Sequence, residues 1–302
     1  LKFLYPRKLI GMRRKVALVM VHTSPLEQAG TGDAGGMNIY VIESAKRMAA
    51  VCVEVDIYTR KISADQPEIV EFEKGIRIIH LDLPIGTKKE EIPSLIPALA
   101  EEFKKKIQGK GYQVIHSHYW ISGKVAMPAA KKFGIPLVHT MHTMAKVKNK
   151  SLAEGEKSEP LVREIGEMQL VETASALIAN TDAEASSLIS LYGANPEKVN
   201  VVAPGVDLIQ FSKADGKTKT RERLKIAPDA LMISFVGRIQ PHKGPEVLVK
   251  AVGEILRSWP ELRSKLALVI MGDNSGSGHN ELEKLRNLAK FLQVEDVIHF
   301  IP

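Results

Sequence analysis

The sequence predicts an α/β protein in which two domains each contain a parallel β-sheet flanked by helices. Short β-rich runs alternate with helical stretches along most of the chain, which is the pattern of βαβ units. This alternation breaks at Pro204-Gly205-Val206-Asp207, where turn-forming residues follow a strand, and it resumes near residue 231. The length of 302 residues also suits two domains of ~150 residues each.

The first domain is predicted to span residues 1–207, with residues 1–11 as an extension before a natural start at Met12. Apolar and β-branched runs predict strands, and apolar periodicity predicts helices. The expected strands are 16–21, 53–58, 113–117, 137–140, 176–180 and 199–202. The expected helices are 36–50, 93–106, 122–133, 159–173 and 182–192, and residues 68–72 and 76–81 form an inserted hairpin around Lys74-Gly75.

The second domain is predicted to span residues 208–302 and to begin with a polar stretch through Lys219. Its expected strands are 231–236, 266–271 and 297–301, and its expected helices are 245–258 and 280–292. A doubly wound sheet has ~6 strands. We therefore expect this chain to hold only the first part of the domain and to be truncated at its C-terminus.

Composition excludes several classes of protein. An apolar content of 44% and a charged content of 25% exclude a disordered or collagen-like chain, and no apolar run approaches the ~20 residues of a membrane span. The single cysteine, Cys52, excludes a disulfide scaffold and fits a cytoplasmic protein. Six basic residues from Lys2 to Lys15 precede the apolar run 16–21. Because that run is short and no cleavage site follows, we interpret it as a strand and not as a signal peptide.

The net charge of +7 suits anionic substrates, nucleic acid or an acidic membrane face, although solvated lysines explain most of it. Aromatic residues make up only 5% of the chain, which disfavours nucleic acid as a partner.

A glycine-rich loop precedes the first expected helix. Gly30, Gly32 and Gly35 match G-x-G-x-x-G, and glycines at a helix N-terminus let a phosphate approach the free N–H groups. The dinucleotide motif follows its strand directly, whereas here seven residues, 23–29, intervene. A flexible glycine loop with a helix cap remains an alternative. A second alternative is an NAD(P) oxidoreductase in which Asp56 or Arg60 binds the ribose of the cofactor.

Two histidine pairs follow the ends of expected strands: His116 with His118, and His139 with His142. Imidazoles commonly bind zinc. However, neither an H-E-x-x-H motif nor a nearby acidic ligand motif supports a metal site here. We therefore predict no metal at these histidines and favour hydrogen-bonded core or polar contacts to a ligand.

The segment Gly237-Arg238 to Lys243-Gly244 lies between a strand and a helix N-terminus. Two cations and a helix dipole can bind a diphosphate. They would stabilise most strongly a diphosphate leaving group whose negative charge grows in the transition state. The alternative is a pair of solvated surface cations.

These segments resemble the retaining sugar-nucleotide transferases of glycosyltransferase family 4. The resemblance rests on Gly35-Gly36, the Pro204–Asp207 hinge, Gly237-Arg238 and Lys243-Gly244. It implies the GT-B fold, two Rossmann-like domains facing each other across a cleft. Within the family the chain is most similar to the inositol-phosphate N-acetylglucosaminyltransferases that open mycothiol biosynthesis. That similarity runs from about Met12 to the end, on the motifs at 22–26, 30–33, 36–38, 116–120 and 147–149.

The resemblance implies UDP-GlcNAc as donor, inositol phosphate as acceptor and no cofactor for the chemistry itself. The implied acceptor residues are His22, Asp33, Ala34, Gly35, Gly36, Met37, Asn38, Lys89, Tyr119, Thr143 and Arg163. The implied donor residues are Gln28, Ala29, Gly36, Arg238 and Lys243. Arg238, Lys243 and His142 would take part in catalysis, with the cations stabilising the leaving UDP.

One element of the family pattern is missing from this chain. The family carries a late E-x7-E element for the donor ribose and sugar. Glu246 and Glu254 have that spacing but lie in the helix after Lys243-Gly244, so the roles are not carried over to them. Magnesium would require residues absent from this chain. Another family 4 enzyme, such as a sucrose-phosphate synthase, or a non-catalytic sugar-phosphate-binding fragment remain alternatives, and a homodimer is a further expectation.

Overall fold

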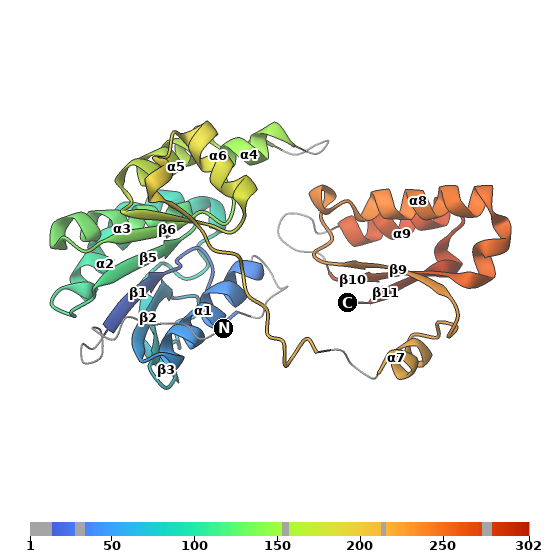
Figure 1. Ribbon diagram of the computed structural model, residues 1–302, viewed down its shortest axis with the longest axis horizontal. Coiled ribbons are helices and arrows are strands. Elements are labelled where there is room, and N and C mark those ends of the chain that lie inside the picture. The colour runs from blue at the N-terminus through green and yellow to red at the C-terminus, as the bar shows by residue number, and fades with distance from the viewer. Residues whose placement is uncertain (1–13, 28–33, 153–156, 213–215, 274–279, 302) are drawn as a thin grey trace. The chain divides into compact units, whose positions relative to one another are not determined.

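The computed structural model describes residues 14–27, 34–152, 157–212, 216–273 and 280–301. The predicted extension 1–11 and the glycines Gly30 and Gly32 lie outside these ranges. The chain divides into two compact units, with the boundary between Pro204 and Gly205 (Figure 1). Each unit is described here by itself.

The first unit is built on one eight-stranded sheet with the order β3-β4-β2-β1-β5-β6-β7-β8. Its strands are β1 (Arg14–Val19), β2 (Val53–Arg60), β3 (Ile69–Glu73), β4 (Ile76–Leu81), β5 (Val114–His118), β6 (Leu137–Thr140), β7 (Ala176–Ala179) and β8 (Val199–Val201). All neighbours pair in parallel except β3 and β4, which form the predicted antiparallel hairpin.

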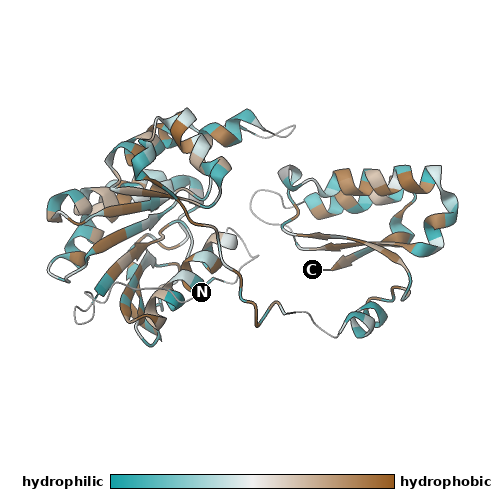
Figure 2. Ribbon diagram, viewed as in Figure 1, coloured by the Kyte–Doolittle hydropathy of each residue, from teal (hydrophilic) through white to brown (hydrophobic). Residues whose placement is uncertain are grey.

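Helices cover both faces of this sheet (Figure 1). They are α1 (Gly36–Ala50), α2 (Ile92–Ile107), α3 (Trp120–Phe133), α4 (Ala145–Lys150), α5 (Leu161–Thr173) and α6 (Asp182–Tyr192), with the short 3-10 helices η2 (Lys89–Glu91) and η3 (Pro196–Lys198). On β1, Leu18 packs in the core beneath α1, and its neighbour Val19 packs in the core beneath α2 and α3. Because both faces are buried, the central strands are apolar almost throughout (Figure 2).

Strand β1 differs from its predicted range, 16–21. Its first residues, Arg14 and Lys15, pair with Val53 and Glu54 of β2 through main-chain hydrogen bonds, which hydropathy does not reveal. Met20 and Val21 are fully buried but lie beyond the strand. Their apolar side chains therefore indicate that this segment is buried, not that it is a strand.

The strand order places a topological switch point beside β1. Strand β1 pairs with β2 on one side and with β5 on the other. The chain therefore leaves the two strands β1 and β5 in opposite directions. In open parallel sheets such a point opens a crevice at the carboxyl ends of the strands, where ligands bind.

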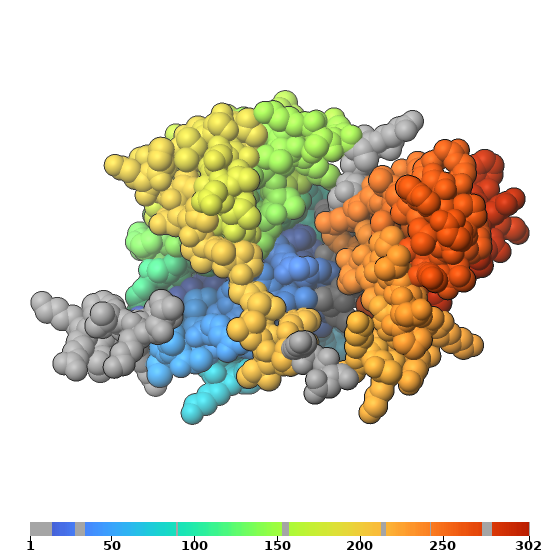
Figure 3. Space-filling model, turned by 45° about the vertical axis from the view of Figure 1, so that its right-hand side comes forward, coloured from blue at the N-terminus to red at the C-terminus, as the bar shows by residue number. Residues whose placement is uncertain are grey.

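The second unit has a three-stranded parallel sheet with the order β11-β10-β9. Its elements are α7 (Lys217–Arg223), β9 (Leu231–Val236), η4 (Pro241–Lys243), α8 (Pro245–Ser258), η5 (Pro260–Lys265), β10 (Leu266–Met271), α9 (Glu281–Phe291), η6 (Glu295–Val297) and β11 (Ile298–Ile301). Helices α8 and α9 cover one face and enclose a core around Val252, Leu268 and Leu285. Residues 205–212 link the two units and lie at the surface (Figure 3). Ile209 in this segment is 89% exposed. Among the described residues, no helix has the length and apolarity to cross a membrane.

A buried ionic cluster joins β1, β2 and β4. Asp56 is 2% exposed and accepts two hydrogen bonds from Arg77, at 2.8 Å each. Tyr112 also donates to this carboxylate, and Lys15 Nζ lies 3.2 Å from it. Burial raises the pKa of Asp56, but the bonds from Arg77 and Tyr112 and the charge of Lys15 outweigh burial and hold it below its ordinary value.

We expect Asp56→Asn to lower the free energy of unfolding of the first unit by about 1.5–3 kcal/mol, the range for hydrogen bonds to a charged group. The native carboxylate stabilises fully above its unfolded pKa of about 4, and this contribution is lost as the pH falls through the lower folded pKa. The difference in free energy of unfolding between wild type and Asp56→Asn should therefore become smaller in acid. Urea unfolding, followed by Trp120 fluorescence in a Trp259→Phe background, measures this difference. A difference that does not change with pH would contradict this account.

Candidate active site

Four predicted site residues come together at the carboxyl ends of the central strands. His22 follows β1, Tyr119 follows β5 and Thr143 follows β6, while Arg163 reaches the same place from α5. The ring centroids of His22 and Tyr119 are 4.4 Å apart, and the Arg163 guanidinium carbon lies 4.9 Å from the centroid of the Tyr119 ring. Arg163 also donates to the carbonyl oxygen and to Oγ1 of Thr143, at 3.1 and 2.9 Å.

Tyr119 is held in a backbone conformation that side chains rarely adopt, with φ 72° and ψ 151°. Its N–H donates to the carbonyl oxygen of Thr140 at 3.0 Å, and its carbonyl accepts from Gly123 N–H in the first turn of α3. His142 also has a positive φ, 61°. Such strained residues cluster at functional sites, where the surrounding structure enforces them.

The Arg163 side chain is buried and bound on several sides. It is 3% exposed, its Nε donates to Glu167 at 2.7 Å, and its Nη1 lies 2.9 Å from Glu159. Glu159 in turn accepts from Lys148 at 2.6 Å. The guanidinium is therefore fixed before any ligand arrives, and this reduces the entropy lost on binding.

Glu167, which supports this arginine, was not predicted from the sequence. Its carboxylate is fully buried and accepts from Arg163, from the Tyr192 hydroxyl and from the N–H of Ala145. One carboxylate thus ties together α5, the end of α6 and the start of α4. A glutamate in a predicted helix gives no sign of burial, so only the neutralising role expected for Arg163 could have pointed to a partner.

Histidines from β5 and from the end of β6 form a neutral cluster. His118 Nδ1 and His142 Nε2 are 3.0 Å apart, and the rings of His116 and His118 have centroids 4.1 Å apart. Burial lowers the pKa of His116 to about 3, of His139 to about 3 and of His142 to about 4. Burial and the neighbouring histidines lower the pKa of His118 well below its ordinary value. All four rings are therefore uncharged at neutral pH.

The N-terminus of α1 presents open backbone beside the same strand ends. A Cβ placed on Gly36 would meet no atom of the described residues within 4 Å. Asn38 supports this turn from beneath: its Oδ1 accepts from Gly35 N–H at 3.0 Å, and its Nδ2 donates to the Ser24 carbonyl at 2.7 Å. Ala34 is fully buried and Met37 packs against the core under α1.

In the second unit, Arg238 and Lys243 lie on the loop from β9 to α8. Neither side chain pairs with a carboxylate among the residues that the structure describes. The loop is fixed by two main-chain hydrogen bonds, from Gly237 N–H to Met271 and from Ile239 N–H to Asp273. A Cβ on Gly272, whose φ is +144°, would lie 1.9 Å from the Gly237 carbonyl oxygen, so the two loops need a glycine for this close approach.

Some predicted residues lie outside the described part of the chain. These are Gln28, Ala29 and Asp33, together with the side chain of Lys89, whose backbone begins η2.

The structure corrects one alternative from the sequence. Asp56 lies in the middle of β2, 2% exposed and bound to Arg77, so it is not available to read a ribose. Arg60 donates to the carbonyl oxygen of Thr87 at 3.2 Å. Within the described ranges, no cluster of three or more His, Cys, Asp or Glu side chains is arranged to hold a metal ion.

Comparisons with known proteins agree with this architecture. The sequence profile of Glycosyltransferase Family 4 matches residues 34–210, and that of Glycosyl transferases group 1 matches residues 216–302. The D-inositol 3-phosphate glycosyltransferase of Kineococcus radiotolerans is 48% identical, over 96% of this chain and 68% of its own length. That of Actinosynnema mirum is 48% identical, over 96% of this chain and 70% of its own length. The chain spans about two thirds of the length of these curated relatives.

Solved structures show the same fold. Sucrose-phosphate synthase from Thermosynechococcus elongatus superposes with a TM-score of 0.84 at 27% identity, over 96% of this chain and 70% of that chain. Anabaena HepE in complex with UDP and glucose superposes with a TM-score of 0.68 at 17% identity, over 95% of this chain and 69% of that chain.

Two α/β units with polar residues gathered at strand ends, together with these matches, define a glycosyltransferase of the GT-B class. The predicted fold class is thereby confirmed. The chain belongs to glycosyltransferase family 4, and its closely similar relatives named above are D-inositol 3-phosphate glycosyltransferases.

Proposed function

We propose that this protein transfers N-acetylglucosamine from UDP-GlcNAc to 1D-myo-inositol 3-phosphate with retention of the anomeric configuration, as the first step of mycothiol biosynthesis. The observation that carries the proposal is the convergence of His22, Tyr119, Thr143 and Arg163 at the switch point of the sheet. The 48% identity to proteins named for this acceptor supports it.

The acceptor phosphate would bind to Arg163, Thr143 and Tyr119, with Lys89 as a second cation. Arg163 is held in place by Glu167 and Glu159, and the Thr143 and Tyr119 hydroxyls can donate to phosphate oxygens. Asn38 would act by shaping the turn, because its amide is already bound to Gly35 and Ser24.

In the first unit, Gly36 at the N-terminus of α1 is proposed as a donor contact. In the second unit, Arg238 and Lys243 are proposed as the residues that bind the donor diphosphate. In the proposed reaction the bond from the sugar C1 to the β-phosphate oxygen breaks, and a bond from C1 to the acceptor oxygen forms on the same face. The departing phosphate oxygen takes the proton of the acceptor hydroxyl, and UDP leaves. Arg238 and Lys243 stabilise the charge that develops on UDP. This chemistry needs no protein nucleophile and no cofactor, and a cytoplasmic location belongs to the same proposal.

Calorimetry and a transfer assay test the proposal. We expect binding of inositol 3-phosphate and UDP-GlcNAc, and a product whose anomeric proton shows the α configuration by NMR. A chain that binds neither ligand, or that yields the inverted product, would overturn it.

A sucrose-phosphate synthase activity is the second candidate, and the superposition at a TM-score of 0.84 favours it. Its acceptor also carries a phosphate group, so Arg163 would serve equally. Competition decides between the two: fructose 6-phosphate should fail to displace inositol 3-phosphate if the first proposal holds.

We expect Gly36→Ala to leave the fold intact while weakening the binding of UDP-GlcNAc. The added methyl group meets no atom of a described residue within 4 Å, and alanine suits a helix better than glycine by up to about 1 kcal/mol. The same methyl group would obstruct a diphosphate approaching the helix N-terminus. Thermal unfolding and calorimetry with UDP-GlcNAc measure the two effects, and unchanged donor affinity would refute a diphosphate at Gly36.

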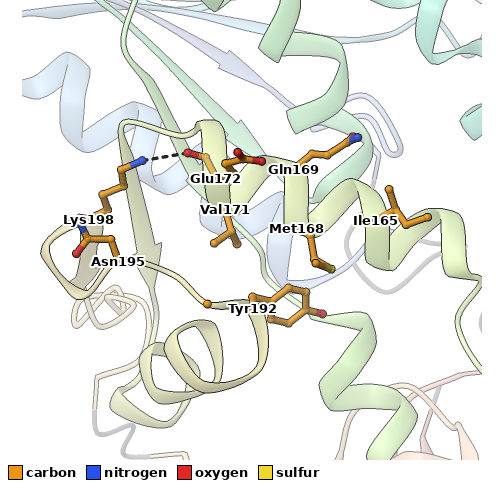
Figure 4. A pocket seen from close by; sticks show the side chains of 9 residues that line it. Ile165, Met168, Gln169, Val171, Glu172, Tyr192, Asn195 and Lys198 are labelled. Atoms are coloured by element: carbon orange, nitrogen blue, oxygen red, sulfur yellow. Dashed lines mark hydrogen bonds between the residues drawn. The ribbon is translucent and has the colours of Figure 1, made fainter.

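The expected homodimer has a candidate surface on α5. Leu161, Val162, Ile165 and Met168 are 70%, 56%, 47% and 46% exposed on its outer face. Beside them lies a pocket of about 450 Å³ that extends to Tyr192 and Lys198 (Figure 4). Monomers normally expose apolar residues singly, whereas this row of four is contiguous. A second copy of the chain would bury the row.

We expect Ile165→Glu to convert a dimer into monomers in sedimentation equilibrium, because the charge would be buried at the interface. Phe291→Glu is the control, since Phe291 is 82% exposed on α9 of the other unit. Wild-type protein that sediments as a monomer would remove this part of the proposal.

A further inference from the structure

The bond between His118 and His142 joins a fully buried ring to a half-buried one. His118 is 0% exposed, and its Nδ1 lies 3.0 Å from Nε2 of His142. Tyr40 of α1 packs edge-on against both rings, with centroid distances of 5.9 and 5.1 Å. His116, stacked on His118, is occupied by its own bond of 2.9 Å to Thr140 Oγ1.

The direction of this bond follows from the other nitrogen of each ring. His118 Nε2 is buried and has no hydrogen-bond partner among the described residues. A neutral imidazole carries one N–H. If His142 donated the bond, His118 would carry its proton on Nε2, as a buried donor with no acceptor. If His118 donates from Nδ1 instead, its N–H is satisfied by His142, and the other N–H of the pair lies on the half-buried His142 ring. Buried N–H groups without a partner are rare, so this second arrangement is favoured.

We propose that His118 is a positioning residue that donates from Nδ1 to Nε2 of His142 and thereby fixes the proton of His142 on Nδ1. The bond to one ring nitrogen sets which nitrogen carries the proton. His142 then presents Nδ1–H as a hydrogen-bond donor, since no described residue occupies that nitrogen.

This assignment limits what His142 can do in the transfer reaction, and in this respect it rests on the proposed function. A ring with its proton on Nδ1 and its Nε2 lone pair occupied by His118 has no free basic nitrogen. His142 can donate to an oxygen of the donor sugar, but it cannot accept the proton of the acceptor hydroxyl. The departing phosphate oxygen, to which the proposed reaction assigns that proton, remains its acceptor.

Nitrogen NMR of histidine-labelled wild-type chain tests the assignment without any activity. Protonated and unprotonated ring nitrogens resonate in separate regions, and spectra of His118→Asn and His142→Ala assign the two rings. We expect a protonated Nδ1 on both His118 and His142, and an unprotonated Nε2 on His142. A protonated Nε2 on His142, or a doubly protonated ring, would overturn the proposal.

Two variants then test the consequence for transfer. Asparagine at 118 can place an amide N–H near the Nδ1 position, whereas phenylalanine cannot donate. We expect His118→Phe to lower kcat about 10–100-fold, the size of effect known for residues that orient metal-binding histidines, with the KM for inositol 3-phosphate unchanged. His118→Asn should restore most of kcat. Equal losses in both variants would refute the positioning role, whereas a wild-type chain with no transfer at all would contradict the proposed function and leave the NMR result standing.

Discussion

Replacing Lys243 with alanine is expected to lower the turnover of UDP-GlcNAc about 10²–10³-fold, the effect of losing one preorganised group that stabilises developing charge. Lys243 is exposed on the loop before α8 and is paired with no carboxylate in the described part of the chain. Its charge is therefore available to a diphosphate. Because the lysine contributes little to packing, thermal unfolding should remain unchanged.

Lys250→Ala is the matched control. Lys250 lies on α8 itself, where its side chain is 58% exposed and forms an ion pair with Glu246. Removing this exposed charge should change turnover by less than about a factor of two. Steady-state kinetics with saturating acceptor separates kcat from KM. Unaltered turnover in Lys243→Ala would end the leaving-group role assigned to this lysine.

Arg163→Met should have two effects, because this arginine neutralises a buried carboxylate and is also the proposed ligand of the acceptor phosphate. Without its guanidinium, Glu167 is left fully buried with no opposing charge. Breaking a buried pair in this way destabilises by about 3–5 kcal/mol. Calorimetric binding of inositol 3-phosphate should also disappear, while binding of UDP should remain.

The double variant Arg163→Met with Glu167→Gln separates these effects. Glutamine can still accept from Ala145 and Tyr192 but carries no charge, so stability should largely return. Binding of inositol 3-phosphate should not return. If it did, Arg163 would only support the fold, and the phosphate would be bound elsewhere.

The alternation of strands and helices could be predicted because the central strands are buried on both faces and so read as continuous apolar runs. The strand pattern depends on residues close together in the sequence. The grouping of His22, Tyr119 and Thr143 was implied by the family resemblance, and it agrees with the strand pattern because parallel strands end at one edge of the sheet.

Features that depend on distant contacts could not be predicted. Helix α4 has no apolar periodicity, and the N–H of its first residue, Ala145, is bound by Glu167, 22 positions away. Helix α7, in the stretch expected to be polar and irregular, is held by Arg221, which donates to the carbonyl oxygens of Ala227 and Ala230. The burial of Arg163 and Asp56 likewise depends on partners that no local pattern marks.

The backbone of Tyr119 sets a conflict for anyone who engineers this chain for heat tolerance. Its dihedral angles of 72° and 151° are ones that glycine adopts freely, so a screen for thermal stability would favour glycine at this position, with a gain of about 1–3 kcal/mol from released strain. That substitution would delete the ring that contacts His22 and Arg163. The more robust protein would be the less active one, so position 119 should be held constant in any stability library.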